Sequence, residues 1–312
     1  SGWTDERLRY GAAPTNYHQE SGDDTGRMAP PAFKADIFEA VSAIDNSLLT
    51  AVDSEPTSSN AVEFLRDEST PWGATGVQAA WRAEGIQMSA TKLATGSEQV
   101  RLHELYAFVI ATGELLQDAP RLADRLTRKS ALAINYKINE AIVNGTGAGQ
   151  PMGWFTSAAK ATVTRAGAGA VAAADVSKML ARVIGVEQSV WYINPDVFPQ
   201  LPVMTVGQQP VWLAPNGFQA APGGTLFGRP VQFLENCQTQ GTSGDIQLVN
   251  PKGYYAATKG NTPEFAESMH LFFDYNMQAF RWTFRVGGQP YLSAAISPAK
   301  GSTTRAHVVV LS

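Results

Sequence analysis

The chain has 312 residues, of which 44% are hydrophobic and 17% are charged, and its formal net charge is −4 at pH 7. This length can bury a sizeable core in two or more lobes, and we expect neither a membrane-spanning segment nor a signal peptide. The negative balance argues against a protein that neutralises nucleic-acid phosphates. The single cysteine, Cys237, excludes an internal disulfide framework and fits synthesis in a reducing compartment. The charged fraction lies below the usual value of about 25%, which suggests a surface used for contacts.

Residues 1–32 have no apolar periodicity and are rich in Gly, Pro, Ser and charge, as is typical of a flexible arm. Three aromatic residues nevertheless recur every seven positions: Trp3, Tyr10 and Tyr17. They could anchor the arm along a neighbouring surface, or they could be incidental aromatics in a tail.

The next segments predict a helix followed by a long hairpin. Residues 33–50 carry apolar side chains at helical spacing. In residues 76–88, Val77, Ala79, Trp81 and Ala83 would fall on one face of a strand, with Gln78, Arg82 and Glu84 on the other. Residues 98–110 are rich in strand formers. A hairpin of that length has no core of its own, so we expect it to lie on the body of the subunit or on another subunit.

Residues 121–143 predict a long helix, with Asp118 as its cap and Asn144-Gly145 as its end. The glycine-rich stretch that follows, "NGTGAGQPMGW", resembles a phosphate-binding loop at first sight. Such a loop needs a Lys and a Ser or Thr directly after its last glycine, but Gly153 is followed by Trp154. The stretch also follows a helix instead of a strand, so we interpret it as a turn that redirects the chain.

The second half of the chain predicts a mixed lobe after a small-residue crossing at 157–175. The lobe opens with a helix, "AADVSKMLARVI", capped near Asp175, and the buried strand "SVWYINP" and the short helix "PDVFPQL" follow. Residues 207–224 predict a loop that exposes Trp212 and Phe218. Strand segments then follow in "TLFGRPVQFLENC", "GDIQLVNPKGYYAAT", the aromatic-rich stretch at 269–292 and "HVVVL".

No group of residues has the spacing of a catalytic or metal-binding set. The histidines are scattered, no serine lies in a nucleophile elbow, and Cys237 has no local histidine. The paired acids Asp23-Asp24 and Asp67-Glu68 are interpreted as solvated charge. We therefore predict no enzymatic activity, no catalytic residue, no cofactor and no metal.

The order of several segments resembles the major capsid proteins of tailed phages, whose fold is named after coliphage HK-97. The resemblance covers about residues 35–292. It is carried, in order, by "LYAFVIATGELLQDAP", "NEAIVNGTGAGQPMG", "WYINPDVFPQL" and "LFGRPV". It implies an α+β HK-97-like capsid fold with an N-terminal arm, an extended E-loop hairpin, a peripheral domain with a spine helix, and an axial domain. These would span 1–52 (arm), 53–104 (E-loop), 105–172 with 256–312 (peripheral, spine helix 120–144) and 173–255 (axial).

The resemblance implies a mature capsid protein that self-assembles as hexamers and pentamers around double-stranded DNA, without sequence-specific binding and without a membrane. It would act in the virion after assembly in the bacterial cytoplasm, with a portal, a scaffolding segment, a maturation protease and a decoration protein as further partners. Ser1 fits a processed N-terminus. An encapsulin-type compartment, or a soluble enzyme whose site assembles from distant residues, is the alternative.

In the cross-linking members of the family, an E-loop lysine joins an asparagine of a neighbouring peripheral domain, helped by a glutamate seven residues further on. Lys92 and Asn276 match the first two, but the third position is Thr283, and no acid lies between Met277 and Leu292. A hydroxyl cannot act as the base that the lysine needs, so we predict a shell without covalent links. The candidate inter-subunit contacts are Trp3, Tyr10, Tyr17, Trp81, Arg82, Lys92, Trp212 and Phe218.

Overall fold

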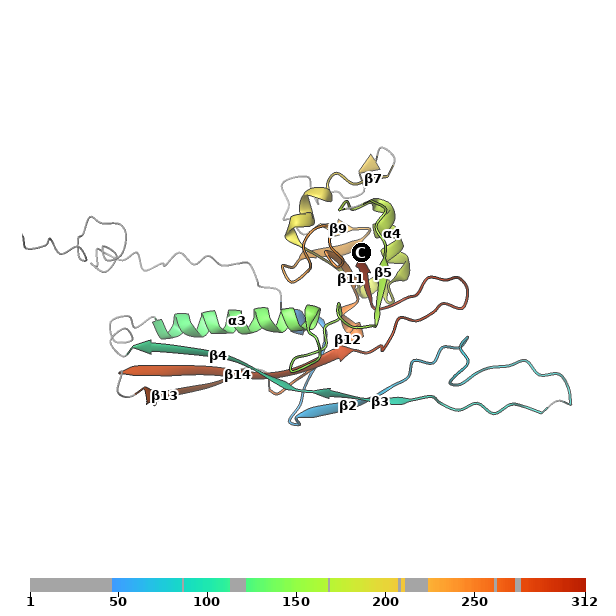
Figure 1. The fold of residues 1–312 in the computed structure, drawn as a ribbon. Helices are drawn as coiled ribbons and strands as arrows, with labels where there is room; N and C mark the ends of the chain where they lie inside the picture. The colour runs from blue at the N-terminus through green and yellow to red at the C-terminus, as the bar shows by residue number, and fades with distance from the viewer. Residues whose placement is uncertain are drawn as a thin grey trace, which may run out of the picture. The chain divides into compact units, whose positions relative to one another are not determined.

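The computed structural model describes residues 47–85, 87–112, 122–167, 169–206, 209–210, 224–260, 263–272 and 276–312. Contacts divide the chain into residues 1–44 and 45–312, and the account below concerns the second unit (Figure 1). Most of the helix expected at 33–50 lies outside the described residues, and its described end forms α1 (Leu48–Ala51). Trp3, Tyr10, Tyr17, Trp212 and Phe218 lie outside them as well.

The first sheet is built around one long strand, β14 (Met277–Pro290), as the aromatic-rich stretch predicts. One edge of β14 pairs antiparallel with β4 (His103–Thr112). Its other edge pairs antiparallel with β13 (Glu264–Phe272) and then with β12 (Tyr254–Thr258). The short strand β1 (Asp53–Pro56) extends the sheet by pairing parallel with β12.

The long helix α3 (Leu122–Asn144) packs on this sheet and confirms the helix predicted over residues 121–143 (Figure 1). Ile134, Ile138 and Ile142 of α3 are buried against Phe280 and Trp282 of β14 in one hydrophobic cluster. Alternation along β4 turns its odd-numbered residues toward this cluster and its even-numbered residues to solvent. Burying each of these large side chains contributes about 1.5–3 kcal/mol, so the helix and the sheet stabilise one another.

The second sheet has the strand order β5-β15-β11-β6-β10-β9. Its strands are β5 (Lys160–Val163), β6 (Val190–Ile193), β9 (Thr225–Leu226), β10 (Arg229–Phe233), β11 (Ile246–Val249) and β15 (Val308–Leu311). Helix α4 (Ala173–Arg182) contributes Val176 and Met179 to its core. Every residue of β11 and β15 is buried, which explains the continuous apolar run of β15; β11 is apolar except for the buried Gln247.

Short helical turns and caps connect these strands. They are η2 (Val186–Gln188), η3 (Pro195–Gln200) and η5 (Pro251–Gly253). Asn194 caps η3 by accepting a hydrogen bond from the Asp196 N–H at 2.9 Å. Asp175 does not cap α4, whose N-cap is Ala172; its carboxylate instead accepts from the Ala166 N–H at 3.0 Å. The sequence therefore predicts this helix and its start at Ala173, whereas the predicted cap near Asp175 is wrong.

The hairpin differs from the expectation. Its strands are β2 (Ala61–Arg66) and β3 (Gly96–Arg101), and the strand predicted over 76–88 is wrong, since the described residues of 67–95 form turns and irregular backbone. Alternating side chains suit a strand, but a strand also needs a neighbour for its backbone hydrogen bonds, and this segment has none among the described residues. A further short pair, β7 (Thr205–Val206) and β8 (Gln209–Pro210), lies apart from both large sheets.

Sheet pairing also bears on the predicted domain boundaries. These boundaries assign β5 and β15 to the peripheral domain together with β4 and β14. In the structure, β15 pairs with β5 and with β11, so both strands belong to the second sheet. The division into an arm, E-loop, peripheral and axial domain otherwise stays a prediction.

Candidate assembly surfaces

The glycine-rich stretch folds back onto the end of α3. The N–H groups of Gly145, Trp154 and Phe155 donate to the carbonyls of Ala141, Ile142 and Val143, each at 2.9 Å. These carbonyls have no partner within the helix, so the returning loop completes its last turn. A Cβ on Gly153 would lie 2.5 Å from the Val143 oxygen, which explains why glycine is needed there. The stretch is a structural turn, as the sequence indicates.

An aromatic cluster fixes the base of the hairpin. The ring of Phe64 on β2 lies 5.5 Å, centroid to centroid, from both Tyr255 and Tyr291. The two tyrosine hydroxyls donate to carboxylates of β1, Tyr291 to Asp53 at 2.6 Å and Tyr255 to Glu55 at 3.1 Å. Burial, and then the hydrogen bond to Glu55, raise the pKa of Tyr255 to about 12. The base is therefore anchored to the first sheet by packing and by hydrogen bonds.

The start of the loop beyond β2 is tethered to residues that follow β14. The Glu68 carboxylate accepts hydrogen bonds from the N–H and the hydroxyl of Ser293, and Trp72 Nε1 donates to the Ser297 carbonyl at 3.0 Å. The Glu68 carboxylate is therefore held by hydrogen bonds within the subunit. The interpretation of Asp67-Glu68 as solvated charge is wrong for Glu68. Asp67 also has a partner, since its carboxylate accepts hydrogen bonds from the Ser69 hydroxyl at 2.6 Å and from the Ser69 N–H at 2.9 Å. The bond from the hydroxyl, and then the bond from the N–H, lower the pKa of Asp67.

Beyond these tethers the loop exposes large apolar side chains. Trp81 is fully exposed, at 105% of the reference area. The other exposed apolar residues of the hairpin and its loop are Leu65, Trp72, Val77, Met88 and Leu93. An apolar surface of this kind marks an interaction site. Arg82 and Lys92, the two remaining described candidates, are exposed on the same loop.

A second apolar surface lies on the outward face of β4. Tyr106, Phe108 and Ile110 are 68%, 45% and 41% exposed, while the residues between them pack toward α3. Arg281 stands opposite Phe108 in the ladder, and an ion pair joins Arg285 to Glu104 with 3.0 Å between Nη2 and Oε2. The sequence predicts this strand but not its exposed face, because apolar side chains occupy both faces of β4.

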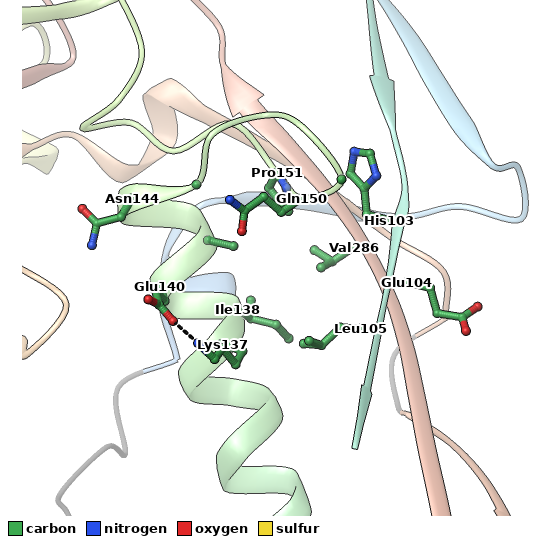
Figure 2. Close-up of a pocket in the computed structure, with 13 residues that line it drawn as sticks. His103, Glu104, Leu105, Lys137, Ile138, Glu140, Asn144, Gln150, Pro151 and Val286 are labelled. Carbon is green, nitrogen blue, oxygen red and sulfur yellow. Dashed lines mark hydrogen bonds and ion pairs between the residues drawn. The ribbon is translucent and has the colours of Figure 1, made fainter. Parts of the chain in front are cut away.

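Figure 2 shows a pocket of about 190 Å³ between the end of α3, the glycine-rich turn and the start of β4. Its apolar lining includes Leu105, Ile138 and Val286. At its rim, Lys137 Nζ donates to Glu140 Oε2 at 2.6 Å, a bond that raises the pKa of Lys137.

The buried polar groups form structural contacts. The guanidinium of Arg165 pairs with the fully buried Asp245, whose carboxylate also accepts from the Gly241 N–H at 2.9 Å. Cys237 is buried, as expected, and burial raises the pKa of its thiol. Within the described residues, no three His, Cys, Asp or Glu side chains are grouped to hold a metal ion. No described helix is both long and apolar enough to cross a bilayer.

Comparison with known proteins gives a consistent result. The model of a family described as the phage capsid family matches residues 25–301, whereas no curated protein matches significantly. The capsid of a native GTA particle is 18% identical, with a TM-score of 0.71 over 95% of this chain and 98% of that chain. The capsid of an empty GTA particle is 18% identical, with a TM-score of 0.68 over 92% and 95%. A structure from Mycobacterium phage Bobi is 12% identical, with a TM-score of 0.63 over 91% and 95%. At these identities the likeness shows a shared fold.

Proposed function

Because the chain belongs to the phage capsid family, it is a structural shell protein that associates with copies of itself, and we propose that it forms hexamers and pentamers of an icosahedral head. The family match over residues 25–301 carries this proposal. The expected α+β HK-97-like fold is confirmed, since the similar structures are capsids of that fold. The exposed apolar hairpin and β4 surfaces support the proposal, because a closed shell would cover them with neighbouring subunits.

Electron microscopy of the purified protein tests this assembly directly. The expected result is closed particles with rings of five and six subunits. Monomers or small oligomers only, at all protein concentrations and salt conditions tested, would contradict the proposal.

Within the subunit, the first sheet with α3 would act as the peripheral domain, and the second sheet with α4 as the axial domain. Clustering of axial domains at the symmetry axes and edge contacts between peripheral domains would form the rings. The hairpin and its loop would be the E-loop. Its candidates Trp81, Arg82 and Lys92, together with Trp3, Tyr10, Tyr17, Trp212 and Phe218, are proposed to contact neighbouring subunits.

The shell is proposed to hold together without covalent links between Lys92 and Asn276. Both residues are exposed, and Thr283 cannot take the proton from a lysine. One acid does lie nearby, since Glu264 of β13 stands directly opposite Thr283 in the ladder. Glu264 is exposed to solvent, whereas activating a lysine requires a base in a dry pocket. Glu264 is therefore the residue to substitute if links are found.

The shell would enclose double-stranded DNA without sequence-specific binding, because a net charge of −4 lets packaged DNA slide. We propose no catalytic role for the chain, a place in the virion after assembly in the bacterial cytoplasm, and a portal, scaffolding segment, maturation protease and decoration protein as assembly partners. The nucleic acid content of purified particles separates a phage head from the encapsulin alternative, which the similar capsid structures do not favour.

A further inference from the structure

The pocket in Figure 2 lies beside β4, which is an edge strand of the first sheet. Among the described residues β4 pairs only with β14, so its other edge presents free backbone N–H and C=O groups over ten residues. The strand has no proline, which would blunt such an edge, and edges of this kind accept an added strand. The pocket is lined by His103 and Leu105 on the α3 side of this edge.

The hairpin loop contains a segment with the complementary pattern. Val77, Ala79 and Trp81 alternate as in a strand, yet the segment has no strand neighbour among the described residues and Trp81 is fully exposed. A strand added beside β4 would turn every second side chain toward α3, because side chains alternate between the two faces. One of these side chains would meet the pocket.

The pocket matches an aromatic side chain in size and polarity. A cavity of roughly 150 Å³ can hold a benzene molecule, and this pocket measures about 190 Å³. Its inner wall is apolar, and the Glu140 carboxylate at the rim offers an acceptor for an indole N–H, which needs a partner when buried. A buried aromatic anchor in a pocket is the usual centre of a protein interface.

We propose that the pocket receives Trp81 of a second copy, whose residues 77–81 pair as a strand with the free edge of β4. This inference rests on the proposed self-assembly and names the surface that receives the loop. The segment then gains in the assembly the neighbouring strand that it lacks among the described residues of one subunit, which explains why its alternating sequence forms no strand there.

Co-assembly of two single-cysteine variants tests the proposal. In a Cys237→Ala background, one subunit carries Trp81→Cys and the other Gln150→Cys, which lines the pocket. After oxidation, shells should yield a reducible heterodimer on a denaturing gel, and unassembled subunits should not. The control pair replaces Gln150→Cys with Phe108→Cys on the outward face of β4. Shells that link only the control pair overturn the proposal and leave the shell function intact, whereas wild-type protein that forms no shells overturns the shell function itself.

A second variant covers the case in which cysteine pairs disturb assembly. Gln150→Trp fills the pocket from its own loop and lies on the surface, so the subunit should fold normally. It should need a subunit concentration about tenfold higher to assemble, corresponding to about 1.4 kcal/mol. Assembly at the wild-type concentration would contradict the proposal.

Discussion

Trp154 Nε1 donates a hydrogen bond to Gln247 Oε1 at 2.8 Å, and neither residue is exposed at all. Trp154 ends the glycine-rich turn after α3, and Gln247 lies in the middle of β11 in the second sheet. The Gln247 amide also donates to the Gly244 carbonyl at 2.9 Å, so its side chain is fixed from both ends. This bond joins the core beneath α3 to the second sheet.

Gln247→Leu should destabilise the subunit, because it leaves the buried Trp154 N–H without an acceptor. The expected loss is about 1–3 kcal/mol of unfolding free energy, measured by urea denaturation of unassembled subunits. Gln150→Leu, at a partly exposed position on the turn, is the matched control and should change the midpoint little. Equal midpoints for the two variants would show that the bond contributes nothing to stability.

Trp81→Ala should leave the subunit folded and weaken its assembly. A buried tryptophan in an interface typically contributes about 3–5 kcal/mol, whereas the same residue exposed in a free subunit contributes little. Circular dichroism should match wild type while sedimentation shows fewer shells. Val186→Ala, at an exposed position on η2 outside both apolar surfaces, is the control and should assemble normally. Shells of normal yield and heat resistance from Trp81→Ala would refute an interface role.

Boiling mature particles in detergent should release one band near the chain mass of 33.4 kDa. The reason is that Thr283 cannot take the proton from a lysine, and that Glu264, the described acid opposite it, is exposed to solvent. A ladder of covalent oligomers would refute this prediction. If a ladder appeared, its loss in Glu264→Gln and its persistence in Glu267→Gln would identify the carboxylate on β13 as the base.

The subunit should lose stability as the pH falls below the ordinary histidine pKa of 6.5. Burial lowers the pKa of His307 in the folded state, opposed in part by a hydrogen bond with the backbone of Ile184. The unfolded chain therefore binds a proton at a pH where the folded chain does not, so stability decreases from about pH 6.5 down to the folded pKa and changes no further below it.

His307→Gln should make stability depend less on pH over this range. Thermal unfolding measured between about pH 7.5 and about pH 5, the range in which histidine changes its charge, checks this. His103→Gln, at a half-buried position on β4, should retain the slope. A wild-type slope in His307→Gln would mean that other groups cause the acid sensitivity.

The sequence predicts the elements whose partners lie within the same chain. The helix α3 consists largely of helix-forming residues and ends at Asn144-Gly145, and β14 is dense in aromatic residues that pack beneath that helix. The segment 76–88 has an equally regular pattern and still forms no strand. Side-chain alternation indicates compatibility with a sheet, but the hydrogen-bonding partner decides whether a strand forms.

The candidate surfaces could be predicted only in part for the same reason. Trp81 can be selected from the sequence because it is a large aromatic residue among alternating apolar positions in a mostly polar region. In the structure its side chain is exposed. Tyr106 and Phe108 did not stand out, because an aromatic residue in a strand usually belongs to the core. Which face of β4 is covered depends on α3, which follows it in the chain, and sequence alone does not give that packing.

The position of β15 constrains the order of events during synthesis. This strand follows all others in the chain, yet it lies between β5 and β11 with its four residues buried. During translation, β5 would have no β15 beside it until nearly the whole chain had been synthesised. Exposed strand edges in such an incomplete chain favour aggregation, so the edges of β5 and β11 would be most vulnerable before β15 takes its place between them.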